Sequence, residues 1–139
     1  TFGRETAATT KGFVMEFIHA PKACASVGPY SHCVKAGSTY YLCGQVPFHP
    51  VTGEVVGNGM KEQAVQTLAN MKAVLEAAGL AVTDIAKTTV FVTNMDDFAA
   101  FNEVYAAFMG EHRPARVCVE VSNIAHGCLL EMDAICFKE

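Results

Sequence analysis

Two helix-like segments, each placed between strand-like runs, constrain the fold of this chain more than any other feature. The first spans about Met60 to Ala78 and ends at Gly79, a residue that often terminates helices. Its apolar residues recur at spacings of three and four, as one face of a helix requires: Ala64, Leu68, Met71, Leu75 and Ala78. The second stops before Pro114 and has a similar stripe: Phe98, Phe101, Val104, Tyr105 and Phe108.

Runs rich in β-branched and aromatic residues surround these helices and predict strands at 13–18, 32–36, 39–45, 85–93, 114–121 and 128–137. Gly37 and Ser38 form a turn that joins the second and third runs into a β-hairpin. The order of elements predicts an α+β two-layer sandwich, with one mixed sheet of about six strands and both helices on one face.

The length of 139 residues indicates a single domain that can bury a core without metals or disulfides. Residues 1–12 are rich in Thr and Ala, and we expect them to be a disordered lead-in to a domain spanning 13–139. Hydrophobic residues make up 51% of the chain and charged residues 17%. In the last two strands both sides are largely apolar, so we expect a closed oligomer that covers the open face of the sheet.

Several classes of function find no support in the sequence. The net charge is −4 and no basic run is present, which argues against nucleic-acid binding. No apolar run approaches the roughly 20 residues of a membrane span. The six cysteines include no Cys-x-x-Cys pair and fit buried thiols in a reducing compartment, which favours the cytoplasm, with mitochondria as the alternative.

The motifs of common cofactor, nucleotide and metal sites are also missing. None of the five histidines is spaced as a metal pair, and there is no glycine-rich nucleotide loop or serine-hydrolase elbow. We therefore expect neither a metal nor a cofactor. Cys118 has no identifiable base as a partner, so a packed thiol is favoured over a nucleophile.

The last two strands carry the most informative charges. Alternation places Arg116, Cys118 and Glu120 on one face, and Glu131 shares a face with Asp133. If these two strands pair, Arg116 and Glu131 lie close together within one chain, or else they meet across a subunit boundary. The residues alone favour a structural ion pair. The alternative is an anion site in which the guanidinium binds a carboxylate and the glutamate holds a water for acid–base chemistry.

Two loop positions have similar alternatives. Tyr30 follows Gly28-Pro29 and is either a packed turn residue or a phenol presented to a ligand. Gly44 ends a predicted strand, where the backbone of a glycine can approach a ligand closely.

Five motifs resemble one known family, the YjgF/YER057c/UK114 family of reactive intermediate deaminases. In chain order they are Gly28-Pro29-Tyr30-Ser31, Cys43-Gly44-Gln45-Val46-Pro47, Gln63-Ala64 with Asn70-Met71, Met95-Asp96-Asp97-Phe98, and Pro114-Ala115-Arg116 followed by Glu131-Met132-Asp133-Ala134-Ile135. The resemblance extends over about 13–137. It implies a chorismate-mutase-like fold and a homotrimer with ligand sites in the clefts between subunits. It also implies hydrolysis of 2-enamine and 2-imine intermediates, such as 2-aminoacrylate, to 2-keto acids and ammonia without a cofactor.

The resemblance assigns roles to particular residues. Arg116 matches the arginine that holds the substrate carboxylate, Glu131 the acid that places the attacking water, and Tyr30 the tyrosine that closes the pocket. Matching positions that present backbone groups to the ligand are Gly44 and Cys118, and Asn102 matches a supporting position behind the ligand.

The sequence departs from the family pattern at Cys43, where many members have serine, and a thiol is the poorer hydrogen-bond donor. The link from Gly110 to Pro114 is also shorter than in some members of the family. An alternative function is therefore a non-catalytic trimeric protein that binds small carboxylates or acts as a regulator. RNA cleavage, an activity attached to some members, is disfavoured by the acidic charge.

Overall fold

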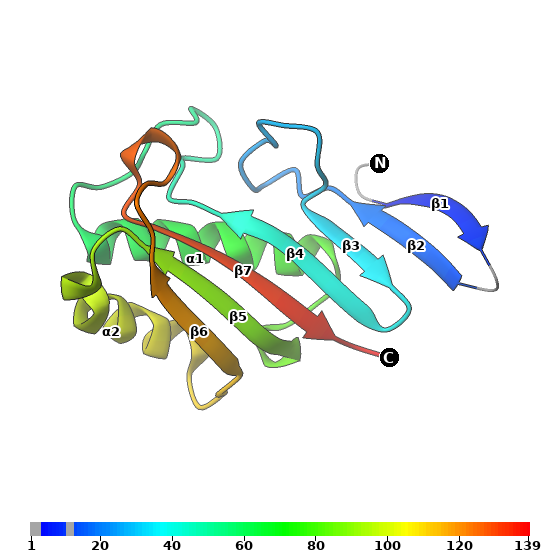
Figure 1. The fold of residues 1–139 in the computed structure, drawn as a ribbon. Coiled ribbons are helices and arrows are strands. Elements are labelled where there is room, and N and C mark those ends of the chain that lie inside the picture. The colour runs from blue at the N-terminus through cyan, green and yellow to red at the C-terminus, as the bar shows by residue number, and fades with distance from the viewer. Residues whose placement is uncertain (1–3, 11–12) are drawn as a thin grey trace.

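The computed structural model describes residues 4–10 and 13–139, and the side chains beyond residue 13. Its elements follow the predicted order, with one additional strand at the start (Figure 1). The strands and helices are β1 (Arg4–Thr10), β2 (Phe13–Ile18), β3 (Cys33–Ala36), β4 (Thr39–Gln45), α1 (Met60–Ala77), β5 (Ile85–Val92), α2 (Phe98–Met109), β6 (Ala115–Glu120) and β7 (Leu130–Phe137). Three short 3-10 turns complete them, η1 (Val82–Asp84), η2 (Met95–Asp97) and η3 (Ala125–Gly127).

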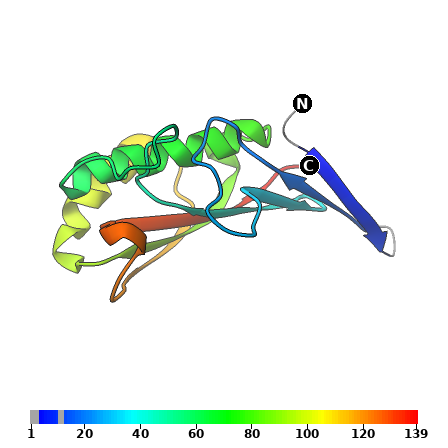
Figure 2. The same cartoon turned by 90° about the horizontal axis from the view of Figure 1, so that it is seen from above.

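The strands form one mixed sheet in the order β1-β2-β3-β4-β7-β5-β6. β5 and β6 are parallel and are joined through α2, as a parallel crossover requires, whereas the other pairs are antiparallel. The last strand, β7, lies between β4 and β5. Both helices cover the same face of the sheet (Figure 2), which confirms the α+β class.

The core lies between the helices and the covered face of the sheet. The predicted stripe of α1 is buried, with Met71 and Ala64 fully inaccessible to solvent. It packs in one cluster with side chains of β5 and β7, including Val90, Leu130 and Met132. Burying a large apolar side chain of this kind stabilises the fold by about 1.5–3 kcal/mol.

The ends of the helices are fixed by local bonds. The backbone N–H of Leu80 donates to the Leu75 carbonyl at 2.8 Å and Gly79 has a φ of +74°, so α1 ends as the glycine predicts. Before η2, the Asn94 side chain accepts from the Asp96 N–H at 2.9 Å.

The expectation of a disordered lead-in at 1–12 is wrong for Arg4–Thr10, which forms β1 and pairs with β2. β-branched threonines recur through this segment and favour extended backbone. β2 also has a free edge whose backbone groups can pair with it. The sheet therefore has seven strands instead of about six.

The sheet face opposite the helices is apolar and solvent-exposed in the single chain. Tyr41 and Phe137 are 50% and 53% exposed, and Val117 and Val119 are 45% and 41% exposed. Exposed apolar side chains gathered on one face in this way are typical of protein interfaces. No described helix combines the length and apolarity needed to cross a membrane.

Candidate functional site

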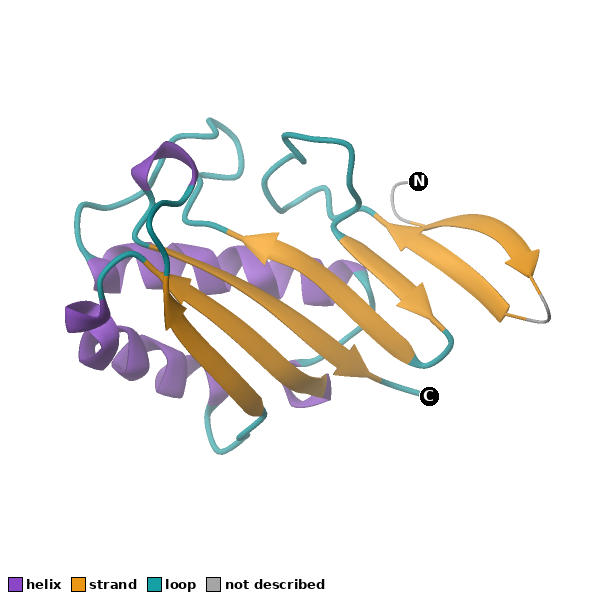
Figure 3. Ribbon diagram, viewed as in Figure 1, coloured by secondary structure: helices purple, strands orange, loops and turns teal. Residues whose placement is uncertain are grey.

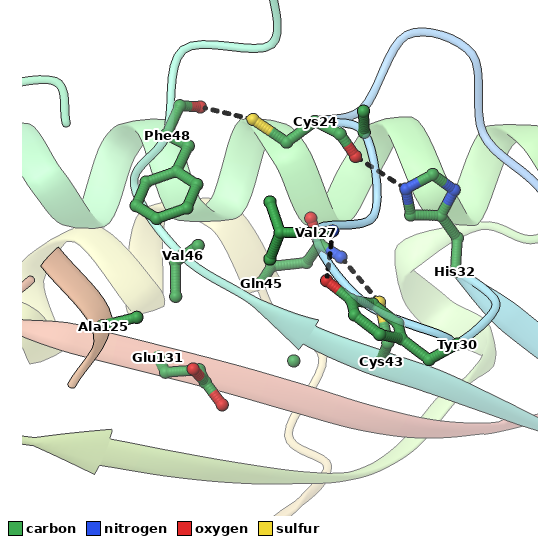
Figure 4. A pocket seen from close by; sticks show the side chains of 12 residues that line it. Cys24, Val27, Tyr30, His32, Cys43, Gln45, Val46, Phe48, Ala125 and Glu131 are labelled. Carbon is green, nitrogen blue, oxygen red and sulfur yellow. Dashed lines mark hydrogen bonds between the residues drawn. The ribbon is translucent and has the colours of Figure 1, made fainter. Parts of the chain in front are cut away.

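Three loops gather at one end of the sheet (Figure 3) and enclose a cavity of about 100 Å³. Four of the predicted site residues line it together: Tyr30, Cys43, Gly44 and Glu131. The other lining residues are Cys24, Ala25, Val27, His32, Gln45, Val46, Phe48 and Ala125. Figure 4 shows Cys43 and Glu131 on the neighbouring strands β4 and β7, with Tyr30 coming from the loop before β3.

Gly44 is placed directly against the carboxylate of Glu131. A Cβ atom added to Gly44 would lie 2.6 Å from Oε2 of Glu131 and 3.0 Å from its carboxyl carbon. The pairing of β4 with β7 is irregular between Leu42 and Gln45, which is where this approach occurs. Glycine at this position therefore lets the acid lie across β4, and a larger residue would require the end of the Glu131 side chain to move.

Glu131 has the electrostatics of a proton-transfer group. Burial raises the pKa of its carboxyl group, and the nearby charge of Asp133 raises it further. The two acids lie on the same face of β7, as predicted. A carboxylate whose pKa is shifted toward neutrality is a better proton acceptor from water than an ordinary glutamate.

The thiol of Cys43 stays protonated at neutral pH. Burial is the main cause that raises its pKa to about 11, and the charges of Glu131 and Asp133 add to it. The amide Nε2 of Gln45 donates a hydrogen bond to the sulfur at 3.1 Å. Cys43 therefore faces the cavity as a neutral thiol that is a weak hydrogen-bond donor.

His32 anchors the loop that carries Tyr30. Its Nδ1 accepts from the Ala20 N–H at 2.8 Å, so the ring hydrogen is on Nε2, which donates to the Cys24 carbonyl at 2.6 Å. Tyr30 lies at the mouth of the cavity, 45% exposed, and its hydroxyl accepts from the Val27 N–H at 3.4 Å. The sequence did not identify His32 as a neighbour of the site.

Arg116 lies elsewhere, at the start of β6 and on the helix-covered face. Its guanidinium carbon is 4.8 Å from the centre of the Tyr105 ring, 5.3 Å from Phe98 and 5.9 Å from Phe101. Its Nη1 donates to Oδ1 of Asn102 at 2.8 Å. All four of these partners belong to α2, which thus supplies an aromatic cradle with one amide. The three rings fit the predicted core stripe of the helix, and the sequence pattern alone does not connect them with Arg116.

The strands of Arg116 and Glu131 do not pair within one chain, which rules out the first of the two arrangements considered from the sequence. β5 lies between β6 and β7, with Thr88 opposite Arg116 and Phe91 opposite Glu131. The two residues therefore lie on opposite faces of the sheet, with Cα atoms about 14 Å apart from ordinary strand spacings. A structural ion pair between them is excluded within one chain, and Arg116 makes no ion pair in the part of the chain that the structure describes.

Cys118 shares the face of Arg116, opposite Val90, and packs against the core. Burial raises the pKa of its thiol, although the charge of Arg116 acts in the other direction. The predicted site residues thus fall into two half-sites in one chain. The acid half-site contains Tyr30, Cys43, Gly44 and Glu131, and the arginine half-site contains Asn102, Arg116 and Cys118.

Comparison with known proteins places the chain in a family. Residues 19–138 match the family model described as Endoribonuclease L-PSP. A RutC family protein of Pyrococcus horikoshii is 48% identical over 124 residues, which cover 89% of this chain and 98% of the relative. The chain belongs to the RutC/YjgF (Rid) family.

Other Rid-family relatives carry more specific names. The 2-iminobutanoate/2-iminopropanoate deaminase of Escherichia coli is 45% identical over 124 residues, covering 87% of this chain and 96% of the relative. The crystal structure of Escherichia coli TdcF with bound serine superposes with a TM-score of 0.84 at 41% identity, covering 88% of this chain and 98% of that one. These matches confirm both the predicted family and the fold.

The Rid-family match extends over both half-sites, since Tyr30, Arg116 and Glu131 all lie within 19–138. Within the described residues, no group of three or more His, Cys, Asp or Glu side chains is arranged to hold a metal ion.

Proposed function

We propose that this protein is an enamine/imine deaminase that hydrolyses 2-imino acids, including the tautomer of 2-aminoacrylate, to 2-keto acids and ammonia. One observation carries the proposal. Arg116 lies on the aromatic cradle of α2 without an acidic partner among the described residues, and Glu131 has a raised pKa in a separate cavity. The 45% identity to an imine deaminase supports the same reaction.

The two half-sites can cooperate only if they come from different subunits. We infer a homotrimer in which the open sheet faces pack together and each cleft joins Arg116 of one subunit to Glu131 of the next. The exposed apolar side chains of that face, among them Tyr41, Val117 and Phe137, support this assembly. A monomeric mass in solution at micromolar concentration would contradict it.

In such a cleft the residues have separate tasks. The guanidinium of Arg116, held by its cradle, binds the substrate carboxylate with two parallel hydrogen bonds. Backbone groups of Gly44 and Cys118 contact the ligand, and Tyr30 closes the opening. Binding next to an oriented water supplies much of the rate because the protonated imine carbon is already electrophilic.

The chemical steps need only water. Glu131 accepts a proton as the water oxygen bonds to the imine carbon, giving a tetrahedral amino alcohol. Glu131 returns this proton to the amine nitrogen and then takes the hydroxyl proton as the C–N bond breaks, so the carbonyl forms and ammonia leaves. The ammonia carries away the proton of a protonated imine as ammonium, which leaves Glu131 ionised. One imine and one water thus yield one 2-keto acid and one ammonia, with no cofactor.

A second function, binding of small carboxylates without turnover, has one specific observation in its favour. Cys43 faces the cavity as a neutral thiol, where a hydroxyl would be the stronger donor to a ligand or water. The relative crystallised with serine shows that a member of the family holds a small amino acid.

A coupled assay separates the two functions. A serine/threonine dehydratase supplies the intermediate, semicarbazide traps it, and the release of keto acid is followed with and without this protein. We expect acceleration by the wild type, none by Arg116→Ala or Glu131→Gln, and full acceleration by Lys72→Ala, an exposed control on α1. Binding of 2-oxobutanoate without any acceleration would support the binding protein instead.

A further inference from the structure

The arginine half-site opens into a hollow of about 480 Å³ that contains a second arginine. Its lining is Asn102, Tyr105, Ala106, Arg113, Pro114 and Arg116. No carboxylate of the same chain lines it, so two guanidinium groups face one space without a compensating charge from their own chain. A mono-anionic 2-imino acid would satisfy only one of them.

Arg113 is held in place by backbone carbonyls just after α2. Its Nη1 donates to the carbonyls of Gly110 and His112, the latter at 2.9 Å. A guanidinium carries five N–H donors, so the three on Nε and Nη2 remain for a ligand. Arg113 forms no ion pair with any residue that the structure describes.

The spacing of the two arginines suits a small ligand with two acidic groups. They stand three residues apart, on either side of Pro114 and Ala115, so their Cα atoms lie at most about 10 Å from each other. The short link from Gly110 to Pro114 keeps Arg113 at the edge of the hollow. Planar guanidinium groups match carboxylates well, because two parallel hydrogen bonds can form.

We propose that Arg113 and Arg116 together form a dicarboxylate site, and that the substrates this protein takes best are 2-imino dicarboxylic acids. Arg116 binds the carboxylate next to the imine carbon, and Arg113 binds the carboxylate at the end of the side chain. The reaction named here rests on the proposed function, whereas the binding preference does not.

The binding preference is tested with two keto acids of equal length, 2-oxoglutarate and 2-oxopentanoate, by calorimetry on the wild type. We expect 2-oxoglutarate to bind about fivefold more tightly, the effect of one exposed ion pair, and this ratio to fall as salt is added. In Arg113→Gln the ratio should drop to about one, whereas in Lys72→Gln it should persist. Equal affinities in the wild type would overturn the proposal.

A simpler role for Arg113 would be that of a cation that stabilises the end of α2. In that case Arg113→Gln would lower the melting temperature and leave the ratio of affinities unchanged, which would also overturn the proposal. Arg113→Lys keeps a charge but not the planar fork, and should retain only part of the preference.

A kinetic experiment separates this proposal from the proposed function. Amino acid oxidases acting on glutamate and on norvaline generate 2-iminoglutarate and 2-iminopentanoate in place. Faster turnover of 2-iminoglutarate, lost in Arg113→Gln, supports both proposals. Equal turnover of the two imines refutes the dicarboxylate site alone, and selective binding without turnover of either refutes the deaminase alone.

Discussion

Gly44 and the carboxylate of Glu131 occupy adjoining space so closely that a single methyl group on Gly44 would lie 2.6 Å from Oε2. Gly44→Ala should therefore displace the acid, because the backbone of β4 is fixed by pairing with both β3 and β7. We expect kcat to fall at least about tenfold, whereas the free energy of unfolding should fall by only about 1 kcal/mol or less, because the atoms that must move are the end of a flexible side chain.

A double variant shows whether the clash is the cause. Gly44→Ala with Glu131→Ala removes the atoms that collide, so the stability should recover relative to the single Gly44→Ala variant, although activity stays lost. Additive losses of stability in the two variants would mean that the side chain of Glu131 does not meet residue 44.

The raised pKa of Glu131 makes a prediction about stability and pH. Since the folded state holds this proton to a higher pH than the unfolded chain, the stability linked to it is full below the ordinary glutamate pKa and is lost as the pH rises through the folded pKa. Glu131→Gln should therefore melt at a higher temperature than the wild type at pH 7, and the difference should vanish near about pH 4. Thermal melts of both proteins across this pH range measure the difference in melting temperature. A variant that is less stable than the wild type at pH 7 would contradict a raised pKa of Glu131 in the folded state.

Activity should respond to the same shift. In the acidic limb of the pH profile, kcat/KM should begin to fall at a pH above the ordinary pKa of a glutamate. The reason is that Glu131 has a raised pKa and must be ionised to accept a proton from water. Asp133→Asn removes a neighbouring charge that raises this pKa, so it should move the acidic limb to lower pH. An unmoved limb would show that another group controls it.

Tyr105 has two separable contacts. Its ring lies 4.8 Å from the guanidinium carbon of Arg116, and its hydroxyl bonds to Oγ1 of Thr88 at 2.8 Å in the core. Tyr105→Leu should raise KM about 2- to 30-fold by loosening Arg116, with a smaller effect on kcat. Tyr105→Phe keeps the ring and should keep KM, while losing about 1 kcal/mol of stability. Equal KM values in these two variants would show that the ring of Tyr105 does not hold Arg116 for substrate binding.

Cys43 decides how well the acid half-site donates a hydrogen bond. Cys43→Ser places a stronger donor beside Glu131, so kcat/KM should rise by about 2- to 10-fold, whereas Cys43→Ala should not raise it. Steady-state kinetics on both variants measure this. A rise in the alanine variant would point to the size of the sulfur and not to hydrogen bonding.

Local patterns predicted most of the fold. The stripe from Ala64 to Leu75 and the hairpin turn at Gly37 depend on neighbours in sequence, and both are confirmed. The pairing of strands depends on contacts far apart in the chain, so the insertion of β7 beside β5 was not predicted. The sequence therefore left open whether Arg116 and Glu131 meet within one chain, which the strand order excludes.

The residues of the candidate site also fall into those that the sequence identified and those that it missed. Tyr30, Gly44 and Glu131 were identified by type and by family resemblance, and the structure brings them together. The aromatic cradle was missed because residues such as Tyr105 fit a core stripe equally well. The available signal was an arginine at the start of the strand that follows a helix rich in aromatic residues. The strand at Arg4–Thr10 was missed because its composition also suits a flexible segment.

The central claim is that each active cleft takes Arg116 from one subunit and Glu131 from the next. Arg116→Ala and Glu131→Ala proteins, each inactive alone, can be mixed in equal amounts, unfolded and refolded together, then assayed for imine hydrolysis. Random trimers should place an intact arginine opposite an intact glutamate in about one quarter of clefts, so about a quarter of the wild-type activity should return. No recovery from mixed trimers of confirmed composition would show that the two residues do not share a cleft between subunits.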